Sequence, residues 1–269
     1  MKKKKKMSRQ QRKVIISGGG TGGHVFPAIA IANALKKLDA SIEILFVGAL
    51  GRMEMEKIPK AGYRIEGLPI AGLQRKLDWR NFLLPFKVIN SLMKARSIVK
   101  KFQPDVAVGV GGYASAPLLY AASRMNIPCL IQEQNSYAGI TNKRLSTRAE
   151  KICVAYEGME KFFPNEKIVM TGNPVRKDIL DLESKRGEGI KFFGLKSEQK
   201  ILLVIGGSLG ARTINDSIRE YLSEILSAGI QVLWQTGKNY FEENSAAAKN
   251  FSEQINVHAF IDRMDLAYA

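Results

Sequence analysis

The chain has 269 residues, of which 45% are hydrophobic, so it is not an intrinsically disordered protein and has room for one large or two modest α/β domains. No stretch of the sequence reaches the ~18 uninterrupted apolar residues that a membrane span needs, and two cysteines are too few for a disulfide framework. The formal net charge of +16 lies entirely in residues 1–101, which carry 22 Lys or Arg against 6 Asp or Glu. Such a field attracts anions, whether nucleic acid, anionic lipid or phosphorylated substrates.

The first part of the chain alternates short apolar runs with helical segments. Residues 1–12 are basic, and we interpret them as a disordered tail without an enzymatic role. A solubility tag and an upstream start are the alternatives for the run Lys2 to Lys6, which precedes a second methionine, Met7. Short, branched runs bounded by turns are typical of buried parallel strands, and their alternation with helices predicts a doubly wound sheet. The predicted strands are residues 14–16, 42–47, 106–110, 127–131 and 151–154, and the predicted helices are residues 27–37 and 86–101.

The pattern restarts after Arg176, beyond a polar segment that resembles a linker. We therefore predict an α/β fold with two Rossmann-like domains, residues 13–176 and 177–269. The second domain contains only about three strands, so we expect it to be incomplete and the chain to lack its C-terminal end. The elements of this part are the linker at residues 182–191, strands at 201–205, 230–235 and 256–261, and a helix from about Thr213.

Three glycine-rich turns lie between a predicted strand and a predicted helix. Successive glycines let the backbone approach a ligand and turn its N–H groups inward, and the following helix adds its positive N-terminal end. This combination favours a phosphate or diphosphate, although tight packing alone is the alternative for each turn. They are GGGTGGH at residues 18–24 (the first glycine loop), GVGGYAS at 109–115 (the second) and GGSLG at 206–210 (the third).

The first glycine loop also fits the dinucleotide pattern G-x-G-x-x-G through Gly18, Gly20 and Gly23. That pattern further requires an acidic residue near the end of the second strand, where it holds a ribose. Here that strand ends in Gly48 and Ala49, which counts against a nicotinamide enzyme.

His24 is one of two histidines and stands at the first turn of the predicted helix, beside the first glycine loop. A neutral imidazole in this position can accept a proton from a substrate hydroxyl. The alternative is a histidine that caps or packs the loop, and the residue types alone leave both open.

Ordered motifs along the chain resemble those of the MurG family of glycosyltransferases, which transfer N-acetylglucosamine from UDP to a lipid-linked muramyl acceptor. The resemblance extends from about residue 14 to residue 269, and motifs in a consistent order are more specific than any one of them. They are GGGTGGHVFPA from residue 18, RMEMEKIPKAGY from 52, PDVAVGVGGYAS from 104, QEQNSYAGITNK from 132, TGNPVR from 171, GGSLGAR from 206 and FIDRM from 260.

The resemblance implies the GT-B fold, with the active site in the cleft between two Rossmann-like domains. It also implies inverting transfer from UDP-N-acetylglucosamine to the C4 hydroxyl of an undecaprenyl-diphosphate-linked muramyl-pentapeptide, with His24 as the base. We expect no cofactor and no metal ion, because helix ends and an arginine would stabilise the leaving diphosphate and the chain has no Asp-x-Asp motif. By resemblance, the donor contacts are Thr21, Gly22, Gly23, Asn135, Arg176, Ser208 and Ile261, and the acceptor-diphosphate contacts are Gly20, Gly111 and Gly112.

Two features depart from the family pattern. Where the family often has His-Glu-Gln-Asn, this chain has Gln132 before Glu133, so Glu133 is the fallback catalytic carboxylate, with a structural role as its alternative. The later family segment, which holds the ribose of the donor, has no counterpart in this sequence. We therefore expect the isolated chain to bind UDP-N-acetylglucosamine poorly and to have little or no activity.

Residues 73–101 interleave apolar and basic side chains. An apolar cluster ringed by cations suits peripheral contact with an anionic membrane surface, and the resemblance implies a lipid-linked acceptor at the cytoplasmic face of the membrane. The alternative is that the apolar residues pack in the core and the cations form a solvated face. The predicted membrane contacts are Leu73, Trp79, Arg80, Phe82, Phe86 and Lys87.

Two other functional classes remain open. A UDP-sugar epimerase of related fold would share the glycine loops and paired domains but would not need the basic, apolar stretch. A nucleic-acid binder would suit the basic composition, but the stretch carries no recognised nucleic-acid motif and the glycine loops would be unexplained. We therefore expect no nucleic-acid partner.

Overall fold

The computed structural model describes residues 11–70, 84–175, 182–207, 209–251 and 253–269, with side chains of helix α3 from Lys87 onward. The chain divides into two compact units, Met1–Arg176 (unit 1) and Lys177–Ala269 (unit 2). Unit 1 contains a seven-stranded parallel sheet and unit 2 a three-stranded one. The predicted α/β fold class is therefore confirmed.

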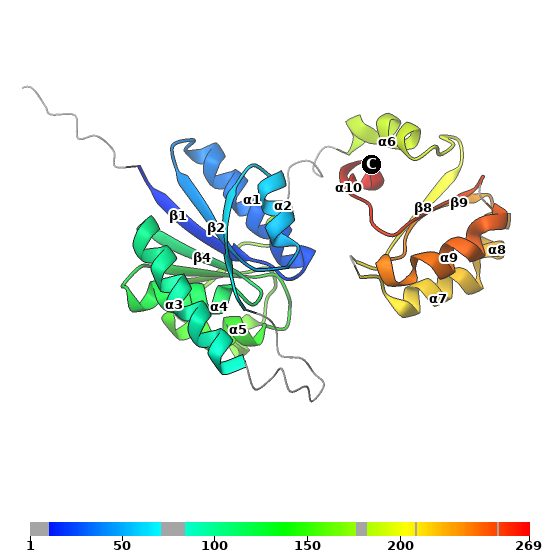
Figure 1. The fold of residues 1–269 in the computed structure, drawn as a ribbon. Coiled ribbons are helices and arrows are strands. Elements are labelled where there is room, and N and C mark those ends of the chain that lie inside the picture. Colours follow the sequence, from blue (N-terminus) through cyan, green and yellow to red (C-terminus); the bar gives the residue numbers. More distant parts are fainter. Residues whose placement is uncertain (1–10, 71–83, 176–181, 208, 252) are drawn as a thin grey trace, which may run out of the picture. The chain divides into compact units, whose positions relative to one another are not determined.

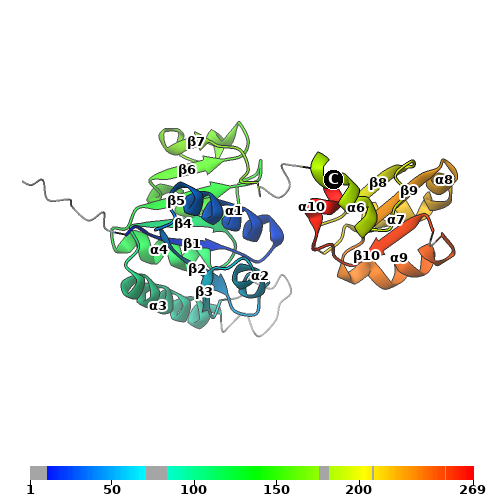
Figure 2. The ribbon, with the colours of Figure 1, turned by 90° about the horizontal axis from the view of Figure 1, so that it is seen from above.

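The strands of unit 1 follow the order β3-β2-β1-β4-β5-β6-β7, which Figure 2 shows from β7 to β3. The chain moves outward from β1 to β3 and then returns to the other side of β1, so the strand order reverses between β1 and β4. In open parallel sheets, ligands bind outside the carboxyl ends of the strands at such a reversal. The strands are β1 Lys13–Gly18, β2 Glu43–Ala49, β3 Arg64–Leu68, β4 Val106–Gly111, β5 Cys129–Glu133, β6 Lys151–Val154 and β7 Ile168–Met170.

Alternate residues of these strands point to opposite faces of the sheet and form two cores. Ile16 of β1 packs with α1 (Gly22–Leu38) and α2 (Glu54–Lys60). Ile15 packs with the helices of the other face, and Figure 1 shows the two helical layers. Burial on both faces explains why the strands read as continuous apolar runs. The helices of the second layer are α3 Leu84–Phe102, α4 Ser115–Arg124 and α5 Ile140–Leu145.

The edge strands β3 and β7 were not predicted. β3 alternates polar and apolar residues, and β7 has only three residues, of which Val169 and Met170 are exposed. β3 therefore lacks the continuous apolar run of a central strand, whereas β7 is an apolar run but a very short one at an exposed sheet edge. Short 3₁₀ helices complete this part of unit 1, at Ser146–Arg148, Met159–Lys161 and Asn165–Lys167.

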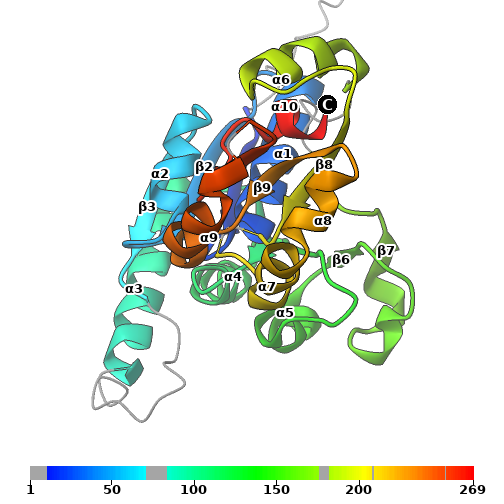
Figure 3. The same cartoon turned by 90° about the vertical axis from the view of Figure 1, so that its right-hand side faces the viewer.

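Unit 2 arranges its strands in the order β10-β9-β8. One face packs with α7, α8 and α9 around Trp234, and the other packs with α6 and α10 around Leu233 (Figure 3). The strand predicted at residues 256–261 ends earlier, at His258, because the chain then turns and buries Ile261 in the second core. The elements are α6 Arg186–Phe192, β8 Lys200–Ile205, α7 Arg212–Glu220, α8 Leu222–Ser227, β9 Ile230–Gln235, α9 Phe241–Ala248, β10 Ile255–His258 and α10 Met264–Tyr268.

The prediction of a linker at residues 182–191 is wrong. A 3₁₀ helix at Glu183–Lys185 leads directly into α6. Gly189 of α6 lies so close to α10 that a Cβ would come within 2.5 Å of the carbonyl oxygen of Leu266. The polar composition that suggested a linker belongs to two helical segments in which Lys185 and Glu188 pair with charged residues at the start of α10.

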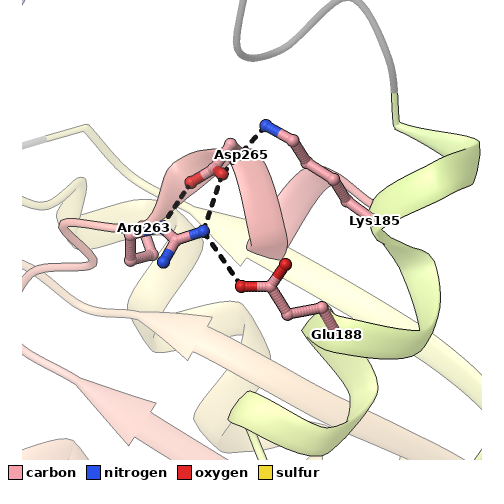
Figure 4. Close-up of polar contacts among 4 residues, drawn as sticks. All are labelled: Lys185, Glu188, Arg263 and Asp265. Carbon is pink, nitrogen blue, oxygen red and sulfur yellow. Dashed lines mark hydrogen bonds and ion pairs between the residues drawn. The ribbon is translucent and has the colours of Figure 1, made fainter.

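Those charged side chains form an ion network between the two helical segments (Figure 4). Asp265 accepts hydrogen bonds from Arg263 at 2.9 and 3.0 Å and from Lys185 at 3.0 Å. Arg263 also reaches Glu188 at 3.3 Å. The hydrogen bonds from Arg263, followed by the one from Lys185, hold the pKa of the Asp265 carboxyl well below its usual range.

Both cysteines lie in neighbouring strands of unit 1, Cys129 in β5 and Cys153 in β6, and both are free thiols. Burial, and then the negative charge of Glu150, raises the pKa of Cys129 to about 11. Burial also raises the pKa of Cys153. Both thiols are therefore held in their protonated form at neutral pH.

Candidate functional site

The first and second glycine loops leave the sheet from β1 and β4, the two strands at the reversal of strand order. The register between these strands shifts at their ends, where Gly18 comes opposite Gly111. The loops are joined directly, because the amide of Gly19 donates to the carbonyl of Gly111 at 3.2 Å. At Gly112 φ is +91°, and a Cβ would collide with the carbonyl oxygen of Gly19, so only glycine fits.

The backbone amides of the first glycine loop divide into those with and those without a protein partner. The amide of Gly20 donates to the buried carboxylate of Glu54 at 2.8 Å, so the predicted contact of Gly20 with an acceptor diphosphate does not fit its amide. Thr21, Gly22 and Gly23, at the start of α1, have amides without a hydrogen-bond acceptor among the described residues. No acidic residue lies in the first turn of α1, so no carboxylate there neutralises the positive helix end. These amides are therefore available to bind an anion.

His24 lies half-buried in the first turn of α1, with its Nδ1 3.1 Å from the carbonyl oxygen of Gly19. A carbonyl oxygen can only accept, so in the neutral ring Nδ1 carries the proton. The hydroxyl of Thr21 is 3.5 Å from the same nitrogen, which is too far to compete. Nε2 lies beside Gly111, where a Cβ would come within 2.7 Å of it. The lone pair of Nε2 is the one that a general base needs.

Glu133, at the carboxyl end of β5, is 1% exposed, and four donors fill its two oxygens. Oε1 accepts from the backbone amide of Asn135 at 3.1 Å and from its Nδ2 at 3.0 Å. Oε2 accepts from the amide of Gly139 at 3.0 Å and from Nδ2 of Asn142 at 2.9 Å. This geometry favours the structural alternative for Glu133 over the fallback base. The exposed Asn135 keeps its side-chain oxygen available to a ligand.

The third glycine loop connects β8 to α7 in unit 2. The loop closes on itself, because the amide of Gly210 donates to the carbonyl of Gly207 at 3.2 Å. Like α1, α7 has no acidic residue in its first turn. The amides at its start have no acceptor among the described residues, so unit 2 offers a second positive helix end.

Gln235, the last residue of β9, fixes two predicted donor segments of unit 2. Its Nε2 donates to the carbonyl of Gly207 at 3.1 Å, and its Oε1 accepts from the amide of Ile261 at 2.8 Å. Ile261 is 3% exposed and belongs to the core, so its side chain does not present a donor contact. Only its backbone carbonyl, which has no partner among the described residues, is left for that role.

Several predicted site residues lie wholly or partly outside the described residues. The backbone of Phe86 belongs to α3, but its side chain is not described, whereas Lys87 is exposed on the same helix. The predicted residues that lie outside the described ranges are Arg176, Ser208, Leu73, Trp79, Arg80 and Phe82.

The described part of α3 carries exposed apolar side chains beside cations. Ile89 is 55% exposed and Met93 62%. A cavity of about 280 Å³ lies between α3 and α4 next to Met93, and Arg96 and Arg124 line it together with Tyr120. None of the helices in the described ranges has both the length and the apolar character for crossing a bilayer.

Glu54 and Gln235 organise the glycine loops but were not singled out from the sequence. Glu54 begins α2, five residues after Ala49, the residue that ends β2. This acidic side chain is buried beneath the first glycine loop, where it accepts from the amides of Gly20 and Ala49, so it is not the ribose-binding residue sought at the end of β2. Gln235 could have been found from the sequence, because it is a polar residue at the carboxyl end of a predicted buried strand.

Comparison with known proteins gives matches along nearly all of the chain. Residues 14–154 match the glycosyltransferase family 28 N-terminal domain, and residues 201–269 match the glycosyltransferase family 28 C-terminal domain. A protein of Cytophaga hutchinsonii named UDP-N-acetylglucosamine--N-acetylmuramyl-(pentapeptide) pyrophosphoryl-undecaprenol N-acetylglucosamine transferase is 59% identical over 250 residues. The match covers 93% of this chain and 67% of that protein.

Solved structures of both transferases and epimerases share this fold, and the sequence identity distinguishes them. Acinetobacter baumannii MurG is 28% identical, with a TM-score of 0.63 over 95% of this chain and 68% of that one. A putative UDP-N-acetylglucosamine 2-epimerase from Listeria monocytogenes has a TM-score of 0.67 over 96% of this chain and 71% of that one, but is 14% identical, which shows a shared fold alone. The chain therefore belongs to glycosyltransferase family 28 and, within it, to the MurG group of N-acetylglucosamine transferases.

Proposed function

We propose that this chain transfers N-acetylglucosamine from UDP-N-acetylglucosamine to the C4 hydroxyl of an undecaprenyl-diphosphate-linked muramyl-pentapeptide, with inversion. The hydroxyl oxygen bonds to the anomeric carbon, the bond from that carbon to the diphosphate breaks, and UDP leaves. His24 takes the hydroxyl proton on Nε2. The observation that carries this assignment is the hydrogen bond from Nδ1 of His24 to the carbonyl of Gly19, because it leaves Nε2 as the acceptor.

The reaction also requires that the negative charge on the leaving diphosphate be stabilised. The N-terminal amides of α7, the third glycine loop, Ser208 and Arg176 would stabilise this charge, as helix ends and a forked guanidinium do for phosphates. In unit 1, the amides of Gly22 and Gly23 would hold phosphate or sugar oxygens of the substrates. We therefore expect transfer without a requirement for a divalent ion.

Asn135 is suited to bind a hydroxyl of the sugar. Its Nδ2 is held by Glu133 at 3.0 Å, which fixes the side-chain amide and leaves its oxygen to accept from a sugar hydroxyl. Glu133 then acts as a positioning residue for Asn135.

The acceptor is attached to a lipid, so the protein must reach a membrane surface. The exposed Ile89 and Met93 of α3, beside Lys87 and Arg96, suit a peripheral contact with anionic lipid. In the sequence these residues follow directly on the predicted contacts at residues 73–87, and their exposure supports peripheral association at the cytoplasmic face.

A single-turnover assay tests the proposed reaction. The chain is placed in excess over a radiolabelled lipid-linked acceptor, so that slow transfer is still detected, and UDP-N-acetylglucosamine is added. UDP should form only with both substrates, and His24→Ala should lower the rate by at least about 100-fold. The matched control is His258→Ala in β10, the other histidine, which should leave the rate unchanged. UDP release or sugar isomerisation without acceptor would favour a hydrolase or an epimerase, and an unaltered rate in His24→Ala would remove His24 as the base.

Binding can be followed separately from turnover. In amide NMR spectra, a soluble muramyl diphosphate or UDP-N-acetylglucosamine should shift the signals of Gly22 and Gly23. UDP alone should shift the signals at the start of α7. Unchanged glycine signals with either ligand would contradict the assignment of the first glycine loop.

A further inference from the structure

The peptide group between Gly19 and Gly20 lies between a buried carboxylate and the proposed catalytic imidazole. Its N–H donates to Oε2 of Glu54 at 2.8 Å, and its carbonyl accepts from Nδ1 of His24 at 3.1 Å. None of the described peptide bonds is cis, and in a trans peptide the N–H and C=O point in opposite directions. One peptide plane therefore connects Glu54 to His24.

Glu54 is held rigidly in this position. It is 1% exposed, and its second oxygen accepts from the amide of Ala49 at 3.0 Å. Both oxygens thus accept from backbone N–H groups, which is the pattern of an ionised carboxylate. No ion pair with a cation of the described ranges neutralises it. The carboxylate therefore accepts hydrogen bonds from two backbone amides. One of them belongs to the Gly19–Gly20 peptide, whose carbonyl contacts His24.

The loop itself permits only one orientation of this peptide. A Cβ on Gly19 would collide with the carboxylate of Glu54, and Gly20 has φ of +85°, which other residues adopt at a cost. Rotating the peptide would remove the N–H from a buried carboxylate, leaving a charge without its donor. The carbonyl of Gly19 is therefore fixed toward the imidazole.

We propose that Glu54 is a positioning residue that acts on His24 through the Gly19–Gly20 peptide, an inference that rests on the proposed role of His24 as the base. The carboxylate fixes and polarises the peptide, and its carbonyl keeps the proton of the neutral ring on Nδ1. Nε2 then faces the acceptor hydroxyl with its lone pair. When Nε2 takes the proton, the same carbonyl stabilises the positive ring, as a carboxylate bonded directly to a histidine does in other enzymes.

Nitrogen NMR of the histidine side chains tests the inference without any turnover. The chain has two histidines, so the variant His258→Gln assigns the His24 signals. At about pH 9, above the usual titration range of histidine, wild-type His24 should have its proton on Nδ1. In Glu54→Gln the side-chain amide cannot accept from both backbone N–H groups. The signals should therefore move toward the Nε2–H form that free imidazole favours in water.

Matched variants separate this effect from a general disturbance of the loop. Glu56→Gln changes an exposed carboxylate of the same helix, which pairs with Lys60, and should leave the tautomer unchanged. Gly20→Ala keeps Glu54 but strains the peptide, and should shift the tautomer in the same direction as Glu54→Gln. Amide signals of the unit 1 strands report whether each variant is folded. An Nδ1–H tautomer retained in both folded variants, Glu54→Gln and Gly20→Ala, would overturn the inference.

The transfer assay distinguishes failure of this inference from failure of the proposed function. Glu54→Gln should lower the maximal single-turnover rate by roughly 10- to 100-fold, with little change in the half-saturating concentration of UDP-N-acetylglucosamine. If His24→Ala abolishes transfer but Glu54→Gln keeps both the wild-type rate and the tautomer, the link through the peptide is wrong. If the tautomer shifts as expected while His24→Ala transfers normally, the link stands and the base assignment is wrong.

Discussion

Gln235 accepts a hydrogen bond from the backbone amide of Ile261 at 2.8 Å, and the same side chain donates to the carbonyl of Gly207. Gln235 is 3% exposed, so both bonds are shielded from water. One side chain therefore sets the spacing between the third glycine loop and the segment after β10, two parts of unit 2 that are more than 50 residues apart in the sequence.

Replacing Gln235 by methionine should disconnect these two segments. The side chain keeps its length, but a buried carbonyl and a buried amide lose their partner, which costs about 1–3 kcal/mol for each group. The thermal midpoint of unit 2 should fall, and UDP affinity should weaken by about tenfold. Calorimetry measures both, with Gln254→Met, at an exposed position, as the control. A lower midpoint with unchanged UDP affinity would mean that Gln235 supports the fold without shaping the donor site.

Gly112→Ala should destabilise unit 1. The added Cβ meets the carbonyl oxygen of Gly19, and φ of +91° is unfavourable for alanine, so the cost should be about 2 kcal/mol or more. Urea unfolding followed by circular dichroism measures this change. Gly23→Ala is the control for stability, because its Cβ would lie in the first turn of α1 at an ordinary contact distance of 3.7 Å from the hydroxyl oxygen of Thr21. That variant should be at least as stable as the wild type. Equal stability of the two variants would contradict the observed contact between the loops.

Unit 2 should lose stability in acid through Asp265. Arg263 and Lys185 hold the pKa of its carboxyl below the unfolded value, which is about 3.9. The folded state therefore binds fewer protons than the unfolded state in this window. The stabilisation is present above pH ~4 and is lost as the pH falls from there toward the folded pKa.

The comparison for this prediction is the variant Asp265→Asn, which has no carboxyl to titrate. Thermal midpoints between about pH 5 and pH 3 should fall more steeply for the wild type than for Asp265→Asn. Glu224→Gln, at an exposed position of α8, should follow the wild-type slope. Parallel curves for the wild type and Asp265→Asn would show that the ion network does not contribute to acid stability.

The exposed face of α3 should govern binding to anionic vesicles. Ile89→Glu combined with Met93→Glu adds negative charge and removes apolar area, so binding to vesicles rich in phosphatidylglycerol should weaken by at least about tenfold. Leu38→Glu changes an apolar side chain that is 82% exposed on α1 and should have a smaller effect. Vesicle sedimentation at several salt concentrations measures the affinity. Binding that is independent of both the salt concentration and the anionic lipid content would contradict the proposed role of this surface.

The central strands could be predicted from the sequence because burial on both faces makes them continuous apolar runs. β1, β4 and β8 were placed within two residues of their observed bounds. β3 was missed because it alternates polar with apolar residues. α6 was missed because it is polar, and the ion pair of its Glu188 forms only in the fold. Local composition does not reveal a partner that is 75 or more residues away, as Glu188 and Arg263 are.

The positions of the glycine loops followed from the sequence, but their internal bonds did not. Glycine content and helix starts indicated an anion site, and His24 was singled out by its place beside the first loop. The role of Glu54 depends on the direction of the Gly19–Gly20 peptide, which only the folded backbone defines. Likewise, the four donors to Glu133 come from the turn after β5 and from the start of α5, whose path no sequence pattern specified.

The protonated thiols of β5 and β6 give unit 1 a built-in unfolding probe. Thiolates react with disulfide reagents, whereas thiols do not, and burial raises the pKa values of both cysteines. Unit 2 has no cysteine at all. Cys129 is the buried one of the two, so its rate of modification at neutral pH reports the opening of unit 1 alone, and a ligand that slows this rate can be assigned to unit 1.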